Sequence, residues 1–220
     1  MGISAAKILD FTIQLAVVLF AISFHESAHA LSAFLLGDHT AKDLGRISLN
    51  PIRHIDPFGS ILLPILLYVT SGLIFGYAKP TPVDLRNTRN PRLADLVVSA
   101  AGPLSNLLLA AVAVVVLLVI RSVPPGSSFA DSVVPPLFQI SLAFLQVNLA
   151  LAIFNLIPIP PLDGSGVLAA ILGGGARRFF NSIAPFGFLI LIIMSATGFL
   201  SRIMSPVYAV VQMIFARLHL

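Results

Sequence analysis

Two histidines and a glutamate stand together near the start of the chain, where residues 25 to 29 read HESAH. Residues four apart on an α-helix share one face, so His25 and His29 can bind the same metal ion. Glu26 beside them can act as a general base, and it is the only glutamate in the chain. The spacing therefore predicts a metal-assisted hydrolase, in which zinc lowers the pKa of a water molecule.

The HESAH motif lies inside an apolar run at residues 8–36 that is long enough to cross a bilayer as a helix. Ionisable groups at membrane depth are costly and tend to be functional. The alternative is that these side chains are polar residues on a stripe facing other helices. Three such residues within five positions favour the metal site.

A catalytic zinc site has three protein ligands and one open position. The extended motif HExxHxxGxxH is absent, because Ser32 and Leu35 occupy its glycine and third-histidine positions. No second glutamate exists to replace that histidine, so the third ligand is Asp or His.

Asp163 is the best candidate for the third ligand, because it follows a proline-broken helix in the sequence NLIPIPPLDG. Broken helices occur at membrane depth only where they line a cavity inside the protein. The alternative role for Asp163 is to cap a half-helix over residues 162–172. His54, in NPIRHIDPFG, competes as a ligand, although a histidine in a polar loop is usually solvated or bonded within a turn.

The composition defines the class of protein around this motif. The 220 residues are 57% hydrophobic and 10% charged, with a mean hydropathy of +0.99. These values exclude a soluble globular domain and a disordered chain. The absence of cysteine excludes disulfides, thiolate metal ligands and a cysteine nucleophile. The net charge of +4 comes from cations scattered through loops, which is typical of membrane topology rather than nucleic-acid binding.

The apolar runs predict an all-α polytopic membrane protein with about four to five spanning helices. Spanning helices are expected at residues 8–36, 93–120, 137–157 and 186–200. Residues 204–220 should form a further helix that either spans or lies at the interface. The sequence GRISLNP at 45–51 is a candidate short strand. We expect one membrane domain over residues 1–220, with a catalytic core at about 8–175 and no extramembrane domain.

Two motifs resemble the signatures of the site-2 protease family of intramembrane zinc metalloproteases. They are HESAHA and NLIPIPPLDG. The segments GRISLNPIRHIDPFGSILLP, GYAKPTPVDLRNTRNPR and SAAGPLSNLLLA resemble the short bacterial and archaeal branch of that family, so the likeness covers most of residues 20–175. It implies an enzyme that hydrolyses peptide bonds within or near transmembrane segments. The implied partners are a transmembrane protein substrate and the lipid bilayer, without nucleic acid.

The resemblance also implies roles for individual residues. His25, His29 and Asp163 would be the ligands of one zinc ion per chain, and Glu26 the catalytic acid and base. Asn155 would be a polar group near the scissile carbonyl. Residues 41–83 would correspond to a short edge-strand region that accepts an extended substrate.

The chain departs from the family pattern in two respects. No PDZ or CBS domain is evident, and the insertion at residues 58–77 is longer than the family core requires.

Two other functions use similar residues. A metal transporter would place ionisable groups along a path, whereas here they gather in two motifs. A catalytically silent membrane scaffold would not need Glu26, which is not required to bind metal. Serine and aspartyl intramembrane proteases fit less well, because Asp163 has no partner acid in a facing motif and no Ser-His pair is evident.

The zinc site also constrains the topology. For one ion to reach all three ligands, helices 8–36 and 137–157 must run in the same direction. Helix 93–120 supplies one reversal, so residues 58–77 should enter the membrane and return to the same side. The loops at 38–57 and 78–92 are both basic, which predicts that they and the site face the cytoplasm of a prokaryotic cell.

Overall fold

The computed structural model describes residues 5–62, 65, 79–124 and 126–218. Within this part of the chain five helical segments are long and apolar enough to span a membrane. They are α1 (Ala5–Leu35), α4 (Pro91–Arg121), α5 (Ser128–Asn155), the segment Gly174–Ala196 containing α7 (Gly174–Ile183) and α8 (Gly187–Ala196), and α9 (Phe199–Leu218). The predicted all-α polytopic membrane protein is therefore confirmed.

The helices begin where side chains can satisfy the first free N–H groups. Asn90 caps α4 by accepting a hydrogen bond from Leu93 N, with Pro91 at the first helical position. Ser127 caps α5 in the same way, from Ala130 N. Short helices connect the long ones, namely α2 (Thr40–Asp43), η1 (Pro51–Arg53), η2 (Pro57–Leu62), η3 (Leu85–Asn87), α6 (Asp163–Leu172) and η4 (Ala184–Phe186).

The expected start of one spanning helix was wrong. The helix expected at 137–157 starts earlier, because α5 begins after the Ser127 cap and continues through Pro135 and Pro136. Prolines are tolerated in membrane helices, where neighbouring groups compensate for the missing N–H. The half-helix expected at 162–172 is confirmed as α6, which ends at Gly173, whose φ of 92° is left-handed, and α7 starts immediately afterwards.

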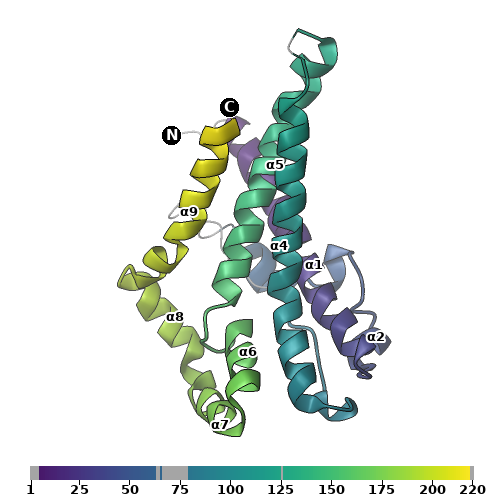
Figure 1. Cartoon of the computed structure of the whole chain (residues 1–220), viewed down its shortest axis with the longest axis vertical. Coiled ribbons are helices and arrows are strands. Elements are labelled where there is room, and N and C mark those ends of the chain that lie inside the picture. The colour runs from purple at the N-terminus through teal and green to yellow at the C-terminus, as the bar shows by residue number, and fades with distance from the viewer. Residues whose placement is uncertain (1–4, 63–64, 66–78, 125, 219–220) are drawn as a thin grey trace.

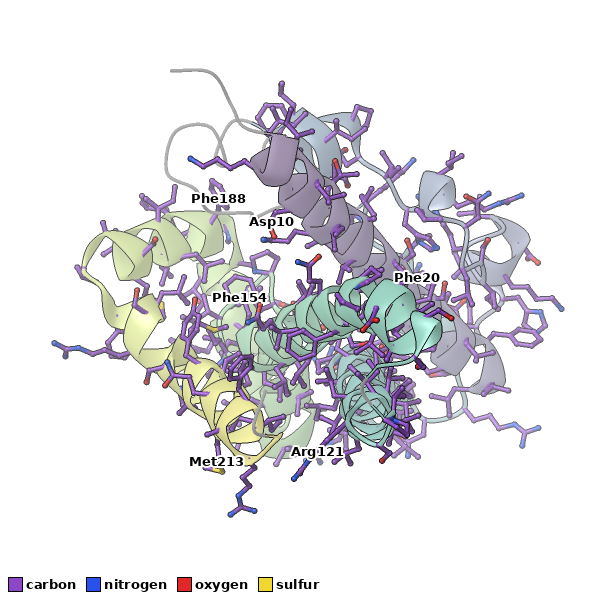
Figure 2. All side chains as sticks on the ribbon, turned by 90° about the horizontal axis from the view of Figure 1, so that it is seen from above. Asp10, Phe20, Arg121, Phe154, Phe188 and Met213 are labelled. Atoms are coloured by element: carbon purple, nitrogen blue, oxygen red, sulfur yellow. The ribbon has the colours of Figure 1, made fainter. Side chains whose placement is uncertain are left out.

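The three helices α1, α4 and α5 pack against one another at the centre of the molecule, and α6 packs on α4 (Figure 1). α1 and α5 run in the same direction and α4 runs against them, as the zinc argument requires (Figure 1). Seen from above, α8 and α9 lie on the opposite side of the molecule from α2 and the described loops next to it (Figure 2). Buried apolar residues of α4, α5 and α9 form one core, which includes Leu117, Leu145 and Val207.

The buried carboxylate of Asp38 holds together the two ends of the connection between α1 and α4. Its Oδ2 accepts a hydrogen bond from Asp84 N at 2.7 Å, and its Oδ1 accepts one from Asn87 Nδ2 at 3.0 Å. The Thr40 backbone and hydroxyl also donate to Oδ1. Both basic loops therefore lie at the same end of α1. Residues 63–64 and 66–78 lie outside the described part of the chain, so the re-entrant course of 58–77 stays a prediction.

The expected strand at residues 45–51 is not formed, and the described part of 41–83 contains no strand. Side chains, rather than a partner strand, engage the backbone of this stretch. The Ser48 carbonyl accepts hydrogen bonds from Ser27 Oγ of α1 and from His54 Nε2. These bonds fold the stretch against α1 as a turn.

Candidate metal centre

His25 and His29 of α1 meet Asp163, the first residue of α6. The two Nε2 atoms are 3.0 Å apart, and Asp163 Oδ2 lies 3.1 Å from that of His25 and 3.4 Å from that of His29. Both histidines are buried and the carboxylate is largely shielded. The structure thus gathers the two histidines and the aspartate that the motifs singled out.

Glycine and arginine residues hold α6 where Asp163 reaches the histidines. A Cβ atom on Gly164 would lie 2.6 Å from Ile157 O and closer still to Leu156 O, so only glycine lets α6 pack under the end of α5. Arg92 of α4 donates from Nε to Ala170 O at 2.6 Å, which satisfies a free carbonyl in the last turn of α6. The alternative role of Asp163 as a helix cap is not found, because Leu162 is the cap residue and makes no side-chain cap bond.

Hydrogen bonds at the far ring nitrogens orient both histidines. His25 Nδ1 lies 2.6 Å from Asn106 Oδ1, and His29 Nδ1 lies 2.7 Å from Val98 O. The Asn106 amide is itself oriented, since its Nδ2 donates to Asn148 Oδ1 at 2.8 Å. Because both partners are acceptors, each histidine carries its proton on Nδ1 and presents the Nε2 lone pair to the centre.

The three converging atoms fit a zinc ion. Asp163 Oδ2 is buried and, among the described residues, has no hydrogen-bond partner. Tetrahedral zinc with bonds of about 2.0–2.1 Å holds its ligand atoms about 3.3 Å apart, which agrees with the three separations here. A Cβ atom on Gly102 would lie 2.5 Å from His25 Nε2, so the absence of a side chain at this position of α4 keeps the space open.

Glu26 lies beside this cluster without belonging to it. Its Oε2 accepts a hydrogen bond from Thr81 N at 2.8 Å, and Thr81 Oγ1 donates to Glu26 O at 3.1 Å. The segment 79–84 is thereby attached to α1 beside the histidines. A carboxylate that is next to the candidate metal ligands but separate from them is placed to carry a proton.

Two other predicted residues lie outside the cluster. Asn155, the last residue of α5, donates from Nδ2 to Leu151 O at 3.0 Å within its own helix. His54 is 1% exposed, and its Nε2 donates to Ser48 O at 2.7 Å. The expectation of a turn-bonded histidine is confirmed, whereas that of a solvated one was wrong. The role of Asn155 stays a prediction.

Sequence reasoning missed the residues that support the ligands, namely Asn106, Asn148 and Thr81. One signal was available, because Asn106 and Asn148 are amides in apolar helices, where an unpaired polar group is costly. Both are completely buried. No local pattern pointed to Thr81.

The sequence of the chain is similar to those of known proteins. The model of peptidase family M50 matches residues 130–195. YwhC of Bacillus subtilis, named as a candidate zinc metalloprotease, is 38% identical over 192 residues, which cover 86% of this chain and 84% of the relative. Rip2 of Mycolicibacterium smegmatis, named likewise, is 32% identical over 195 residues, covering 87% and 70%. No solved structure matches the chain significantly.

Proposed function

The chain belongs to peptidase family M50, the site-2 protease family of intramembrane zinc metalloproteases, and on this premise we propose how its own residues form the catalytic centre. His25, His29 and Asp163 are the ligands of one zinc ion per chain. Glu26 is the catalytic acid and base. The observation that carries this assignment is the convergence of three lone-pair atoms, 3.0–3.4 Å apart, around the space left by Gly102.

When bound, zinc supplies a Lewis acid and lowers the pKa of a water molecule to about 7. Asn106 and the Val98 carbonyl hold the two imidazoles in the tautomer that ligates. Glu26, oriented through its Oε2 by the Thr81 N–H, accepts the proton of the attacking water and returns it to the leaving amine. The Asn155 amide releases its hydrogen bond to Leu151 O when substrate binds and donates instead to the developing oxyanion.

The substrate is a membrane protein that reaches the centre from the bilayer. A transmembrane helix has its backbone groups paired internally, so the substrate must unwind locally before a carbonyl can approach the site. We infer that the chain lies in the prokaryotic cell membrane with its centre towards the cytoplasm. The two loops joined at Asp38 carry most of the loop cations, whereas residues 122–127 at the opposite end carry none.

A metal transporter and a silent scaffold are not favoured. A transport path requires ionisable groups at successive depths, whereas the described cluster gathers three ligands at one point. A scaffold would need neither the histidine tautomers nor Glu26.

The test separates metal binding from proton transfer. Purified protein should contain about one zinc per chain, and His25→Ala and Asp163→Asn should lose both zinc and cleavage. Glu26→Gln should keep zinc and lose cleavage, because it removes only the proton carrier. The substrate is a membrane protein that accumulates uncleaved in cells carrying Glu26→Gln. His39→Gln, at an exposed histidine, is the matched control and should keep both properties.

Two results would contradict the proposal. Full zinc content in both ligand variants would refute the ligand set. Cleavage at the wild-type rate by Glu26→Gln would refute the assigned acid and base.

A further inference from the structure

A cavity lies between the described parts of the two loops that connect α1 to α4. Its volume is about 470 Å³, within the usual range for a small-molecule site. The residues that line it are Leu44, Arg46, Arg53, Lys79, Pro80 and Pro82. The two loops that Asp38 joins both contribute to it.

The cavity is strongly positive. Its three ionisable lining residues are all cations, and none of them forms an ion pair with a described residue. The sequence between Asp56 and Asp84 contains no acid, so the residues outside the described part of these loops supply no counter-charge either. No described carboxylate therefore pairs with these three cations.

Among the three cations, Arg46 is buried and has no described carboxylate as a partner. It is 7% exposed, and its Nη1 donates to Arg53 O. A buried guanidinium without a carboxylate is costly, because a buried charge must be paired to offset its lost hydration. Burying this charge beside an open cavity is consistent with an anionic ligand.

Large apolar side chains are exposed in the same connection between α1 and α4 as the cations. Leu44 and Ile52, in the same loop as Arg46 and Arg53, are 62% and 77% exposed. Phe58 and Leu62, farther along the connection, are each more than half exposed. Loops outside spanning helices normally expose polar residues, so this mixture of apolar and basic groups is typical of a membrane interface. Acyl chains would contact the apolar residues, and phosphates would contact the cations.

The cavity also lies against the segment that touches the catalytic glutamate. Pro80 and Pro82 line the cavity, while Thr81 between them bonds Glu26. The segment 79–82 therefore separates the cavity from α1 and has one face towards each. A ligand in the cavity would press on the segment that orients Glu26.

We propose that this cavity binds the headgroup of an anionic phospholipid, whose phosphate is held by Arg46, Arg53 and Lys79. The occupant is a lipid rather than a soluble anion, because Leu44 lines the cavity and further large apolar side chains that acyl chains could contact are exposed in the same connection. The binding does not depend on proteolysis or on zinc.

The test measures lipid retention by the full-length zinc-loaded protein. Native mass spectrometry in detergent gives the affinities for phosphatidylglycerol and for phosphatidylcholine, which has no net charge. We expect the wild type to prefer phosphatidylglycerol by at least about tenfold. A basic residue near the surface accounts for about fivefold in affinity, so the Arg53→Gln/Lys79→Gln double variant should lose about twentyfold or more.

The matched control is Lys42→Gln/Arg89→Gln, which removes the same charge from the same two loops without touching the cavity. It should keep the preference for phosphatidylglycerol. An equal loss in the control would show diffuse surface attraction and overturn the proposal. Equal wild-type affinity for the two lipids would overturn it as well.

Two further measurements complete the test. Inorganic phosphate is added as a competitor, and displacement of phosphatidylglycerol at equal affinity would assign the cavity to a soluble anion and overturn the lipid. Zinc content and thermal midpoint confirm that the variants fold. If the double variant does not fold, Lys79→Gln alone, at an exposed side chain, should lose about fivefold, and an unchanged affinity would overturn the proposal.

Discussion

For the substitution Gly102→Ala, helix propensity and the geometry of the metal centre predict opposite effects. Alanine is preferred over glycine inside a helix by about 1 kcal/mol, so propensity alone predicts a stabilised α4. The structure predicts damage, because the new Cβ would lie 2.5 Å from His25 Nε2 and closer to His29 Nε2. Ordinary van der Waals contact for a Cβ starts at 3.4 Å, so the ring of His25 must move by about 0.9 Å.

The size of the loss follows from this displacement. Functional groups work only within about 0.5 Å of their productive position, and the shift exceeds that tolerance. Altering the groups that merely orient metal ligands costs about 10-fold to 100-fold in affinity. Because Gly102→Ala moves the ligands themselves, we expect zinc affinity to fall by about 100-fold or more.

The assay is competition with a chelator, followed by measurement of bound zinc, together with thermal unfolding in detergent. Gly102→Ala should gain much less stability than the wild type on zinc addition. Gly175→Ala in α7 is the matched control, because its Cβ would meet no atom within 4 Å, and it should bind zinc normally. Zinc affinity within threefold of wild type in Gly102→Ala would refute the reasoning.

Three more predictions follow from particular contacts. Asn106→Leu should lower zinc affinity by about 10-fold to 100-fold without abolishing folding, because the imidazole of His25 loses the acceptor that fixes its tautomer. The same chelator competition measures this affinity, and an unchanged value would contradict the role of Asn106. Burial raises the pKa of Asp38, but hydrogen bonds to its carboxylate outweigh burial and lower that pKa from 3.8 to about 2. Because the folded-state pKa is lowered, the ionised Asp38 stabilises the fold above pH 3.8, and the free energy of unfolding of the wild type should fall by about 2 kcal/mol as the pH drops from about 4 to 2. Asp38→Asn should be less stable than the wild type at neutral pH and should lack this pH dependence in thermal unfolding. A parallel loss of stability in both proteins would refute the role of Asp38. Single cysteines at Thr40, Asn87 and Ser127 in this cysteine-free chain test the topology with an impermeant thiol reagent on intact cells. Only Ser127 should be labelled, and labelling at Thr40 or Asn87 would contradict the assigned orientation.

The sequence alone determined the features that depend on local spacing. The apolar runs, as helices, are long enough to cross the hydrocarbon core of the bilayer, and they predicted spanning helices because a chain in lipid must pair its backbone polar groups internally. The i, i+4 spacing of His25 and His29 placed them on one face for the same local reason. The local signals failed at Pro135 and Pro136, where helix-breaking residues lie inside α5 because membrane surroundings tolerate them.

Only the tertiary structure decided which third side chain lies next to His25 and His29. Both Asp163 and His54 were open as a third ligand, and the choice depends on long-range packing. The turn after α5 places α6 against α4 and brings Asp163 to the histidines, while hydrogen bonding to Ser48 O holds His54 in its own turn. The acceptors at Asn106 and Val98 and the bare Gly102 come from α4, far away in the chain. A metal centre needs lone pairs fixed within tenths of an ångström, and such positions result from contacts between helices that no local pattern encodes.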